Sequence, residues 1–315
     1  MRALVDGLDP AQGQVVIIGD TKSPADFALP GARFLGIEAQ HATGLASARL
    51  CPTRHYARKN LGYLLAIRDG IDLIQETDDD NLPIDGFFDP VARAAAVPTL
   101  QQAGWANVYR YFADGTIWPR GLPLDEIHGA LPAFETLTVE TADCPIQQGL
   151  ANGNPDVDAI FRLVSPRDVT FRPDRRLALG SDTWCPFNSQ NTVWFPDAFP
   201  LLYLPAHCSF RMTDIWRSFV AQRIAWANGW SVLFHHATVW QDRNPHNLMR
   251  DFEDEIPGYT NNARIATALG DLPITAGPAA MADNLIRSYE ALIGLGVVGE
   301  AELPLLRCWL ADLGL

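Results

Sequence analysis

The sequence contains very little lysine. Of its 24 lysine and arginine residues only Lys22 and Lys59 are lysines, and 37 acidic residues give a formal net charge of −13. A nucleic-acid-binding surface needs concentrated basic residues, and none of the arginine clusters here is large. The sequence therefore argues against DNA or RNA as a partner, and a protein of this charge would bind phosphate groups locally, through a metal ion and a few cations.

Paired cysteines, long apolar runs and a leader-like N-terminal segment are also missing. The five cysteines are widely spaced and form no Cys-x-x-Cys pair, which is typical of reduced thiols rather than of a disulfide framework or a zinc site. No run of about 18 apolar residues predicts a transmembrane helix, and no basic segment followed by an apolar core predicts a signal peptide. These features predict a soluble, cytoplasmic protein without an integral membrane span.

The first third of the chain has the pattern of an α/β sheet. A continuous apolar run over residues 15–18 predicts a buried strand, and residues 33–37 predict a second one. Apolar positions recur at helical spacing over residues 57–69, Gly70 ends this helix, and a further strand follows over residues 71–74. Strand, helix and strand in such short order predict an α/β fold with a mostly parallel central sheet.

The middle of the chain, residues 83–200, is rich in proline, glycine and aromatic residues, which predicts loops with short strands such as 108–111. A helix is expected over residues 214–226, because apolar residues mark its successive turns, and a strand over residues 231–234. Later in the chain the pattern is helical again, which predicts two C-terminal helices.

The chain has no convincing interdomain linker. Its 315 residues, 48% of them hydrophobic, are enough to bury a substantial core. We expect a main domain over residues 1–270 and a C-terminal helical extension over residues 271–315 that packs on it.

Three consecutive aspartates, Asp78, Asp79 and Asp80, directly follow a predicted strand. In open α/β sheets, ligands bind outside the carboxyl ends of the strands. Clustered carboxylates repel one another unless a cation neutralises them, and hard oxygen ligands suit Mg²⁺ or Mn²⁺. The sequence thus favours a metal site here, although a solvated acidic turn is the simpler alternative.

Two further pairs of charged residues occupy positions where a phosphate or nucleotide could bind. Arg58 and Lys59 begin a predicted helix, where backbone N–H groups favour anions. Asp20 and Lys22 follow the first predicted strand, a place that often meets a base or ribose. A solvated basic pair and an ordinary turn are the respective alternatives.

The predicted helix at residue 214 begins with a carboxylate. Asp214 could contact an acceptor hydroxyl and take its proton. Arg217 and Trp216 beside it could form one wall of a sugar pocket, with Arg217 binding the donor. Alternatively, Asp214 or Thr213 is simply the N-cap of the helix and carries no chemistry.

Three histidines, His235, His236 and His246, fall within twelve positions. One of them could complete a metal shell begun by the aspartates, and we favour His246, which follows a proline in a polar loop. The sequence contains no Gly-x-Ser-x-Gly, Walker or dinucleotide-binding motif, which argues against the usual hydrolases, ATPases and Rossmann dehydrogenases.

Taken together, these segments resemble the STELLO-like glycosyltransferase family. The motifs that carry the resemblance are residues 58–67, 76–81, 204–205, 210–217, 222–223 and 241–252. Residues 149–159 additionally resemble the reversibly glycosylated polypeptides, which are UDP-arabinopyranose mutases.

The resemblance implies a GT-A-like fold that binds a nucleotide-sugar. By this analogy Asp78 and Asp80 contact the metal and the diphosphate, Asp79 lies nearer the sugar or ribose, and Asp214 lies on the acceptor side. The expected activity is metal-dependent transfer of a sugar, from a UDP-sugar donor and with Mn²⁺ or Mg²⁺, to a glycan or another hydroxyl-bearing acceptor.

Two alternatives stay open: a nucleotide-sugar mutase, and a non-catalytic scaffold that binds a nucleotide-sugar. The chain departs from the mutases in much of its middle region, and from the plant STELLO proteins in having no predicted membrane anchor. The sugar, the acceptor, the stereochemical course and the oligomeric state cannot be predicted from the sequence.

Overall fold

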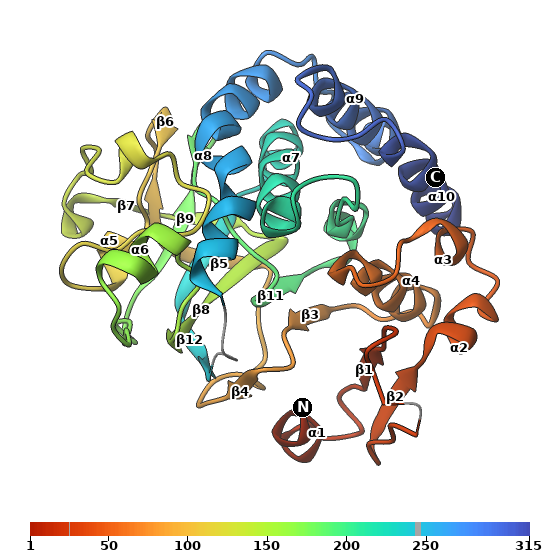
Figure 1. Cartoon of the computed structure of the whole chain (residues 1–315). Coiled ribbons are helices and arrows are strands. Elements are labelled where there is room, and N and C mark those ends of the chain that lie inside the picture. The colour runs from red at the N-terminus through yellow and green to blue at the C-terminus, as the bar shows by residue number, and fades with distance from the viewer. Residues whose placement is uncertain (25, 243–246) are drawn as a thin grey trace.

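The computed structural model describes residues 1–24, 26–242 and 247–315, and one eight-stranded sheet forms its centre (Figure 1). The strands of this sheet are β3 Ile74–Thr77, β4 Asn81–Pro83, β5 Ala94–Leu100, β7 Thr138–Asp143, β8 Ile146–Gly153, β9 Arg176–Leu179, β11 Asn191–Trp194 and β12 Val232–Gln241. Their order is β3-β11-β8-β12-β9-β5-β7, and β4 pairs with β12 beside this path. Two small parallel pairs stand apart: β1 Val15–Ile18 with β2 Ala32–Leu35, and β6 Gly104–Trp105 with β10 Thr183–Trp184.

The central sheet is mixed, so the prediction of a mostly parallel sheet was wrong. Among the described residues, only the β8–β12 and β5–β9 pairs of this sheet are parallel, and the other pairs are antiparallel. The first predicted strands, β1 and β2, are indeed parallel, but they form their own small sheet. Parallel strands need a crossover of a dozen or more residues, usually a helix. Five strands of the central sheet lie within residues 83–200, where the sequence predicts loops with short strands rather than strand–helix units.

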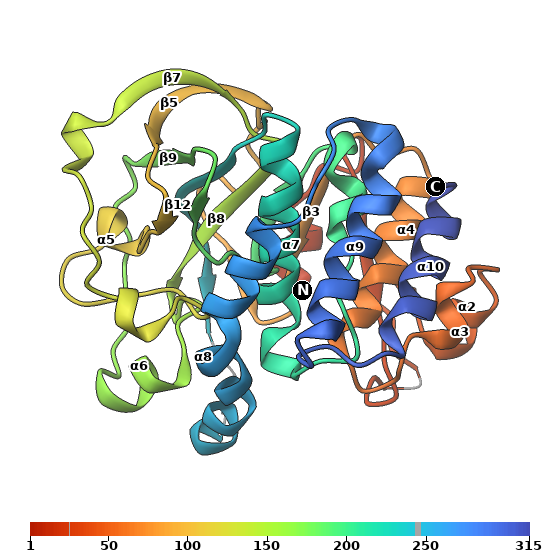
Figure 2. The same cartoon turned by 90° about the horizontal axis from the view of Figure 1, so that it is seen from above.

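Ten α-helices are described. They are α1 Arg2–Gly7, α2 Ile37–His41, α3 Ser47–Leu50, α4 Lys59–Arg68, α5 Tyr109–Phe112, α6 Ala159–Val164, α7 Thr213–Ala227, α8 Leu248–Gly270, α9 Met281–Gly294 and α10 Glu302–Leu313. Seen from above, α7 lies between the sheet and a group made of α4, α9 and α10 (Figure 2). None of the helices in the described ranges is both long and apolar enough to cross a membrane.

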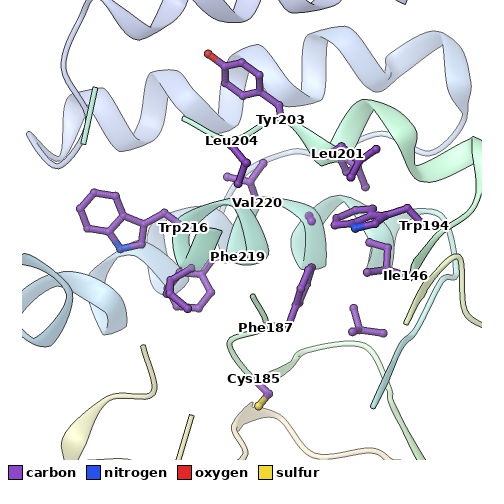
Figure 3. Packing of buried hydrophobic residues seen from close by; sticks show 14 of the residues in the cluster. Ile146, Cys185, Phe187, Trp194, Leu201, Tyr203, Leu204, Trp216, Phe219 and Val220 are labelled. Carbon is purple, nitrogen blue, oxygen red and sulfur yellow. The ribbon is translucent and has the colours of Figure 1, made fainter. Parts of the chain in front are cut away.

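Helix α7 is the centre of the hydrophobic core. Twelve of its 15 residues are buried, and its polar residues are buried together with its apolar ones. Figure 3 shows its Trp216, Phe219 and Val220 with Tyr203 on one side and Phe187 on the other. This packing confirms the helix expected over residues 214–226.

The two predicted C-terminal helices are present as α9 and α10. They pack against each other, and they also contact α3, α4 and α7. Tyr289 and Trp309 belong to the same hydrophobic core as the residues of α7. The division of the chain at residue 270 stays a prediction.

Three local predictions differ from the structure. The strand expected over residues 108–111 is the helix α5, because a short apolar run does not distinguish strand from helix. The strand expected over residues 71–74 begins only at Ile74, since Ile71 is exposed. The strand expected over residues 231–234 continues to Gln241 as β12.

A buried ion pair connects β3 to α7. Arg217 donates two hydrogen bonds to the carboxylate of Glu76, at 3.0 and 2.7 Å, and both side chains are only 1% exposed. The hydroxyl of Tyr63 and the indole N–H of Trp194, at 2.9 Å, donate to the same carboxylate. Glu76 therefore has four donors, which is what a buried carboxylate requires.

We predict that Glu76→Ala destabilises the fold by about 3–5 kcal/mol, because it leaves the Arg217 guanidinium buried and without its counter-charge. Urea unfolding of the variant measures this loss. The matched control is Asp114→Ala, which removes one partner of the surface pair Arg172–Asp114, where the side chains are 38% and 89% exposed. The control should cost no more than about 1 kcal/mol. Equal losses in the two variants would contradict a structural role for the buried pair.

Asp158 is a second buried carboxylate, at the start of α6. It caps the helix by accepting from the Phe161 N–H at 2.8 Å, and it accepts from the Trp118 indole at 2.7 Å. Burial raises the pKa of Asp158 to about 6, and the nearby charge of Glu255 adds to this. The folded protein therefore holds this proton more tightly than the unfolded chain.

Because the folded-state pKa is the higher one, this group stabilises the fold below pH ~4 and loses that contribution as the pH rises to about 6. The shift corresponds to roughly 3 kcal/mol. In Asp158→Asn, which retains a capping side chain, this part of the pH dependence should vanish. Urea unfolding of parent and variant at several pH values between 4 and 7 checks this, and parallel curves would refute the assignment.

Candidate functional site

The three consecutive aspartates lie at the carboxyl end of β3, as the sequence predicts. Asp78 is the first residue after the strand, and its carboxylate accepts a hydrogen bond from Lys59 Nζ at 2.5 Å. Lys59 is the first residue of α4, and its Nζ also donates to the carbonyl of Ser189 at 3.3 Å. The structure thus brings together the acidic motif and the basic helix start, two motifs 19 residues apart.

The electrostatics of this pair are dominated by negative charge. Burial lowers the pKa of Lys59, but the carboxylates of Asp78 and Glu76 outweigh burial and the pKa is raised. Burial also raises the pKa of Asp78, and the charges of Asp80 and Asp214 keep it raised in spite of Lys59. Arg217 and Arg120 neutralise Glu76 and Asp214. Among the described residues Lys59 is the only cation paired with the side chains of Asp78, Asp79 and Asp80, so this group favours an additional cation.

The next two aspartates differ in their surroundings. Asp79 is exposed, whereas both carboxylate oxygens of Asp80 lie 3.3 Å from the side-chain nitrogen of Gln241. Gln241 pairs with Asn81 in the β4–β12 register. Each of these two amides has a buried side-chain oxygen without a hydrogen-bond donor among the described residues.

This donor set fits a hard divalent cation. Two carboxylates follow β3, the two unsatisfied amide oxygens belong to residues that are paired beside them, and oxygen ligands are what Mg²⁺ and Mn²⁺ prefer. The described residues contain no group of three or more His, Cys, Asp and Glu side chains that could hold a metal alone. A cation bound here would therefore depend on ligands beyond the carboxylates.

Arg58 lies beside Lys59 but is almost fully buried, and its guanidinium is bonded to other residues of the protein. Its guanidinium donates to Gln40 Oε1 and to the carbonyls of Cys51, at 2.7 Å, and Pro52, at 3.4 Å. It therefore holds the loop that leads to α4. The predicted contact with a diphosphate stays untested, and the side chain is 2% exposed.

Asp20 and Lys22 follow β1, as predicted. The carboxylate of Asp20 accepts backbone N–H bonds from Thr21 at 2.6 Å and from His55 at 3.1 Å. Burial raises the pKa of Asp20, but these N–H groups and that of Arg54 outweigh it and the pKa is lowered. Asp20 thereby ties the end of β1 to the loop before α4, whereas Lys22 is exposed.

Asp214 is the second residue of α7 and is 3% exposed. Arg120 donates to both of its oxygens, at 3.1 and 3.0 Å, and the Ser189 N–H donates at 3.2 Å. Burial raises the pKa of Asp214, but the Arg120 guanidinium outweighs burial and lowers it to about 2. A carboxylate of such low pKa accepts protons poorly, so this environment suits a fixed charge that orients Arg120 better than a general base.

Sequence reasoning missed Arg120, which connects two acidic residues. Besides Asp214, its guanidinium contacts the carboxylate of Asp156 through two bonds of 2.8 Å. Tyr56 was missed as well, and its hydroxyl accepts the backbone N–H of Asp214 at 2.9 Å. Nothing near Arg120 in the sequence indicates this role, although Asp156 lies in the conspicuous motif over residues 149–159.

The remaining residues predicted for the site do not all lie where a ligand could reach them. Arg217 is occupied by Glu76 and reaches no open surface in this structure, so a donor would meet it only after a rearrangement. His235 and His236 lie within β12 rather than after it, and burial lowers the pKa of both, that of His235 to about 4. His246, the favoured metal ligand, lies outside the described residues.

Comparison with known proteins agrees with the motifs. Residues 211–315 match the family of STELLO glycosyltransferases. Probable glycosyltransferase STELLO2 of Arabidopsis thaliana is 31% identical over 329 aligned positions, which cover 95% of this chain and 41% of that protein. Probable glycosyltransferase STELLO1 of the same plant is 33% identical over 246 positions, covering 72% of this chain and 32% of that protein.

The chain thus spans about two fifths or less of the length of these relatives. The match to STELLO2 covers nearly all of this chain, and the family match includes the start of α7 with Asp214 and Arg217. The family match and the two relatives together support the assignment of this chain to the STELLO-like glycosyltransferases.

Proposed function

We propose that this protein is a metal-dependent glycosyltransferase of GT-A type. It transfers a sugar from a nucleotide-sugar donor, with UDP as the nucleotide, to a hydroxyl-bearing acceptor. The observation that supports this most is the ion pair of Lys59 with Asp78 at the carboxyl end of β3, with Asp79 and Asp80 next in the chain. The family assignment and the names of its relatives agree with a transferase.

Lys59 can serve either of two partners. Without a ligand its ammonium group neutralises part of the charge of Asp78, and both side chains are partly exposed, at 23% and 36%. When a diphosphate is bound, the same ammonium group can donate to phosphate oxygens from the first turn of α4, where backbone N–H groups also favour an anion. It then stabilises the negative charge that develops on the departing diphosphate.

Asp78 and Asp80 would hold the divalent cation, with Asn81 or Gln241 as sources of amide oxygen. A bound Mn²⁺ or Mg²⁺ supplies Lewis-acid stabilisation of diphosphate charge. The carboxylates themselves position the donor and define where its diphosphate lies. Asp79, which is exposed, is free to contact the ribose or the sugar.

Asp214 and Arg120 border this site through Ser189, whose carbonyl accepts from Lys59 and whose N–H donates to Asp214. We assign Asp214 the role of a positioning residue that orients Arg120 and Tyr56 beside the donor. Asp20 supports the same site from the end of β1.

The direct test is turnover of a panel of UDP-sugars with Mn²⁺, with and without candidate glycan acceptors. We expect slow release of UDP without acceptor and faster release with a suitable one. Rearrangement of the sugar within the donor would instead indicate a mutase. Donor binding without any turnover across the panel would indicate a scaffold and contradict the proposal.

Asp80→Asn should weaken UDP binding in the presence of Mn²⁺ by roughly 10- to 100-fold, because it removes a charged metal ligand. Calorimetry with Mn²⁺ and with chelator measures this. The fold should be unaffected within about 0.5 kcal/mol, since the side chain is partly exposed. Asp72→Asn, an exposed aspartate before β3, is the control and should change nothing. Equal affinity of the parent in Mn²⁺ and in chelator would refute the metal role.

Lys59→Ala should weaken the binding of UDP by about 10-fold or more, but that of uridine very little, because Lys59 would meet only the diphosphate. Titrations of both ligands against parent and variant measure the difference. Arg68→Ala, at the exposed far end of α4, is the matched control for removing a cation from this helix. Equal losses for UDP and uridine would show that the effect is structural.

A further inference from the structure

Three aromatic side chains form a continuous group beside the site. The rings of His55 and Tyr56 are nearly parallel, at an angle of 4° and a centroid distance of 6.2 Å. Phe210 contacts both rings edge-on, with centroid distances of 5.3 Å to each. We call these three side chains the aromatic shelf.

The shelf presents apolar surface to the solvent. Phe210 is 46% exposed, and His55 and Tyr56 are partly exposed. A single exposed phenylalanine is common in folded proteins. Here, however, the exposed ring packs against two further rings that are themselves held in place, so its orientation is fixed and it offers a rigid aromatic surface.

The backbone around the shelf is fixed by several bonds. The N–H of His55 donates to Asp20 at 3.1 Å, and the hydroxyl of Tyr56 accepts from Asp214 N–H at 2.9 Å. The Ala57 N–H donates to His55 Nδ1 at 3.1 Å, which leaves Nε2 as the protonated nitrogen of a neutral ring. The shelf is thus ordered before any ligand arrives, and His55 Nε2–H can act as a donor.

Tyr56 of the shelf lies next to the Lys59–Asp78 pair. Lys59 Nζ lies 5.9 Å from the centre of the Tyr56 ring and 2.5 Å from the Asp78 carboxylate. An aromatic surface therefore stands next to the lysine and the carboxylate of the proposed metal–diphosphate site. A nucleoside diphosphate has the same order of parts, with a flat base at one end and two phosphates at the other.

We propose that the aromatic shelf binds the base of the donor nucleotide, with Phe210 as the stacking surface and His55 Nε2–H as a donor to a base carbonyl. This inference rests on the proposed function, because it names the part of the nucleotide that this region of the same site recognises. Bases stack on aromatic side chains with little dependence on their identity. A donor such as His55 favours bases that carry a carbonyl oxygen, as uracil does.

The test compares UDP with pyrophosphate, each titrated with Mn²⁺ against the parent, Phe210→Ala and Phe210→Trp. Phe210→Ala should weaken UDP binding by roughly 10- to 100-fold and leave pyrophosphate binding unchanged, because only UDP has a base. Phe210→Trp, which keeps an aromatic face, should restore UDP binding. Val139→Ala removes a 63% exposed apolar side chain on β7, at the opposite edge of the sheet, and should change neither affinity.

Unchanged UDP binding in Phe210→Ala would overturn the inference, and a loss of turnover alone would assign the shelf to the acceptor instead. Equal weakening of UDP and pyrophosphate would also overturn it, because the effect would then lie in the diphosphate region. A parent protein that binds pyrophosphate with Mn²⁺ but not UDP would contradict the base assignment. A parent that binds neither would overturn the proposed function itself, and this inference with it.

Discussion

The buried ion pair between Glu76 and Arg217 determines how the two halves of the candidate site face each other. Glu76 lies in β3, two residues before Asp78, and Arg217 lies in α7, three residues after Asp214. A shift of α7 along the sheet would break bonds that no water can replace, because both side chains are buried. The acidic motif and the start of α7 are therefore held in one arrangement.

Other buried contacts likewise hold the loops of the candidate site in place. Arg120 connects Asp156 to Asp214, and Glu302 of α10 accepts from the backbone N–H groups of Ala206 and His207. The C-terminal helix thereby anchors the loop that leads to Phe210 and α7. Groups that are ordered before binding lose less conformational entropy when a ligand arrives.

Much of the local structure could be predicted from the sequence, because patterns with a strong period are specific. The helix of α7, the two C-terminal helices and the position of Asp78–Asp80 after a strand follow from such patterns. The mixed sheet could not be predicted in the same way. Its strand β8 is rich in Gln, Gly and Asn, and Gln148 is buried only because partners from distant segments satisfy it.

The candidate site, too, could be predicted from the sequence only in part. Lys59 and Asp78 were predicted separately, and only the fold brings them into contact. Arg120 and Tyr56 could not be found from local patterns, since their roles depend on contacts 94 and 158 residues away. Charge types can be read from a sequence, whereas burial and partners, which decide whether a charge is structural or functional, depend on the fold.

We expect Asp78, Asp80 and Lys59 to bind a metal–diphosphate complex together. Anomalous diffraction from crystals soaked with Mn²⁺ and UDP is the decisive measurement. It should show a manganese peak bound to a carboxylate oxygen of Asp78 or Asp80, with the diphosphate of UDP on that ion and within hydrogen-bond reach of Lys59 Nζ. A manganese ion elsewhere, or UDP bound with its diphosphate away from Lys59, would show that these three residues do not form the donor site.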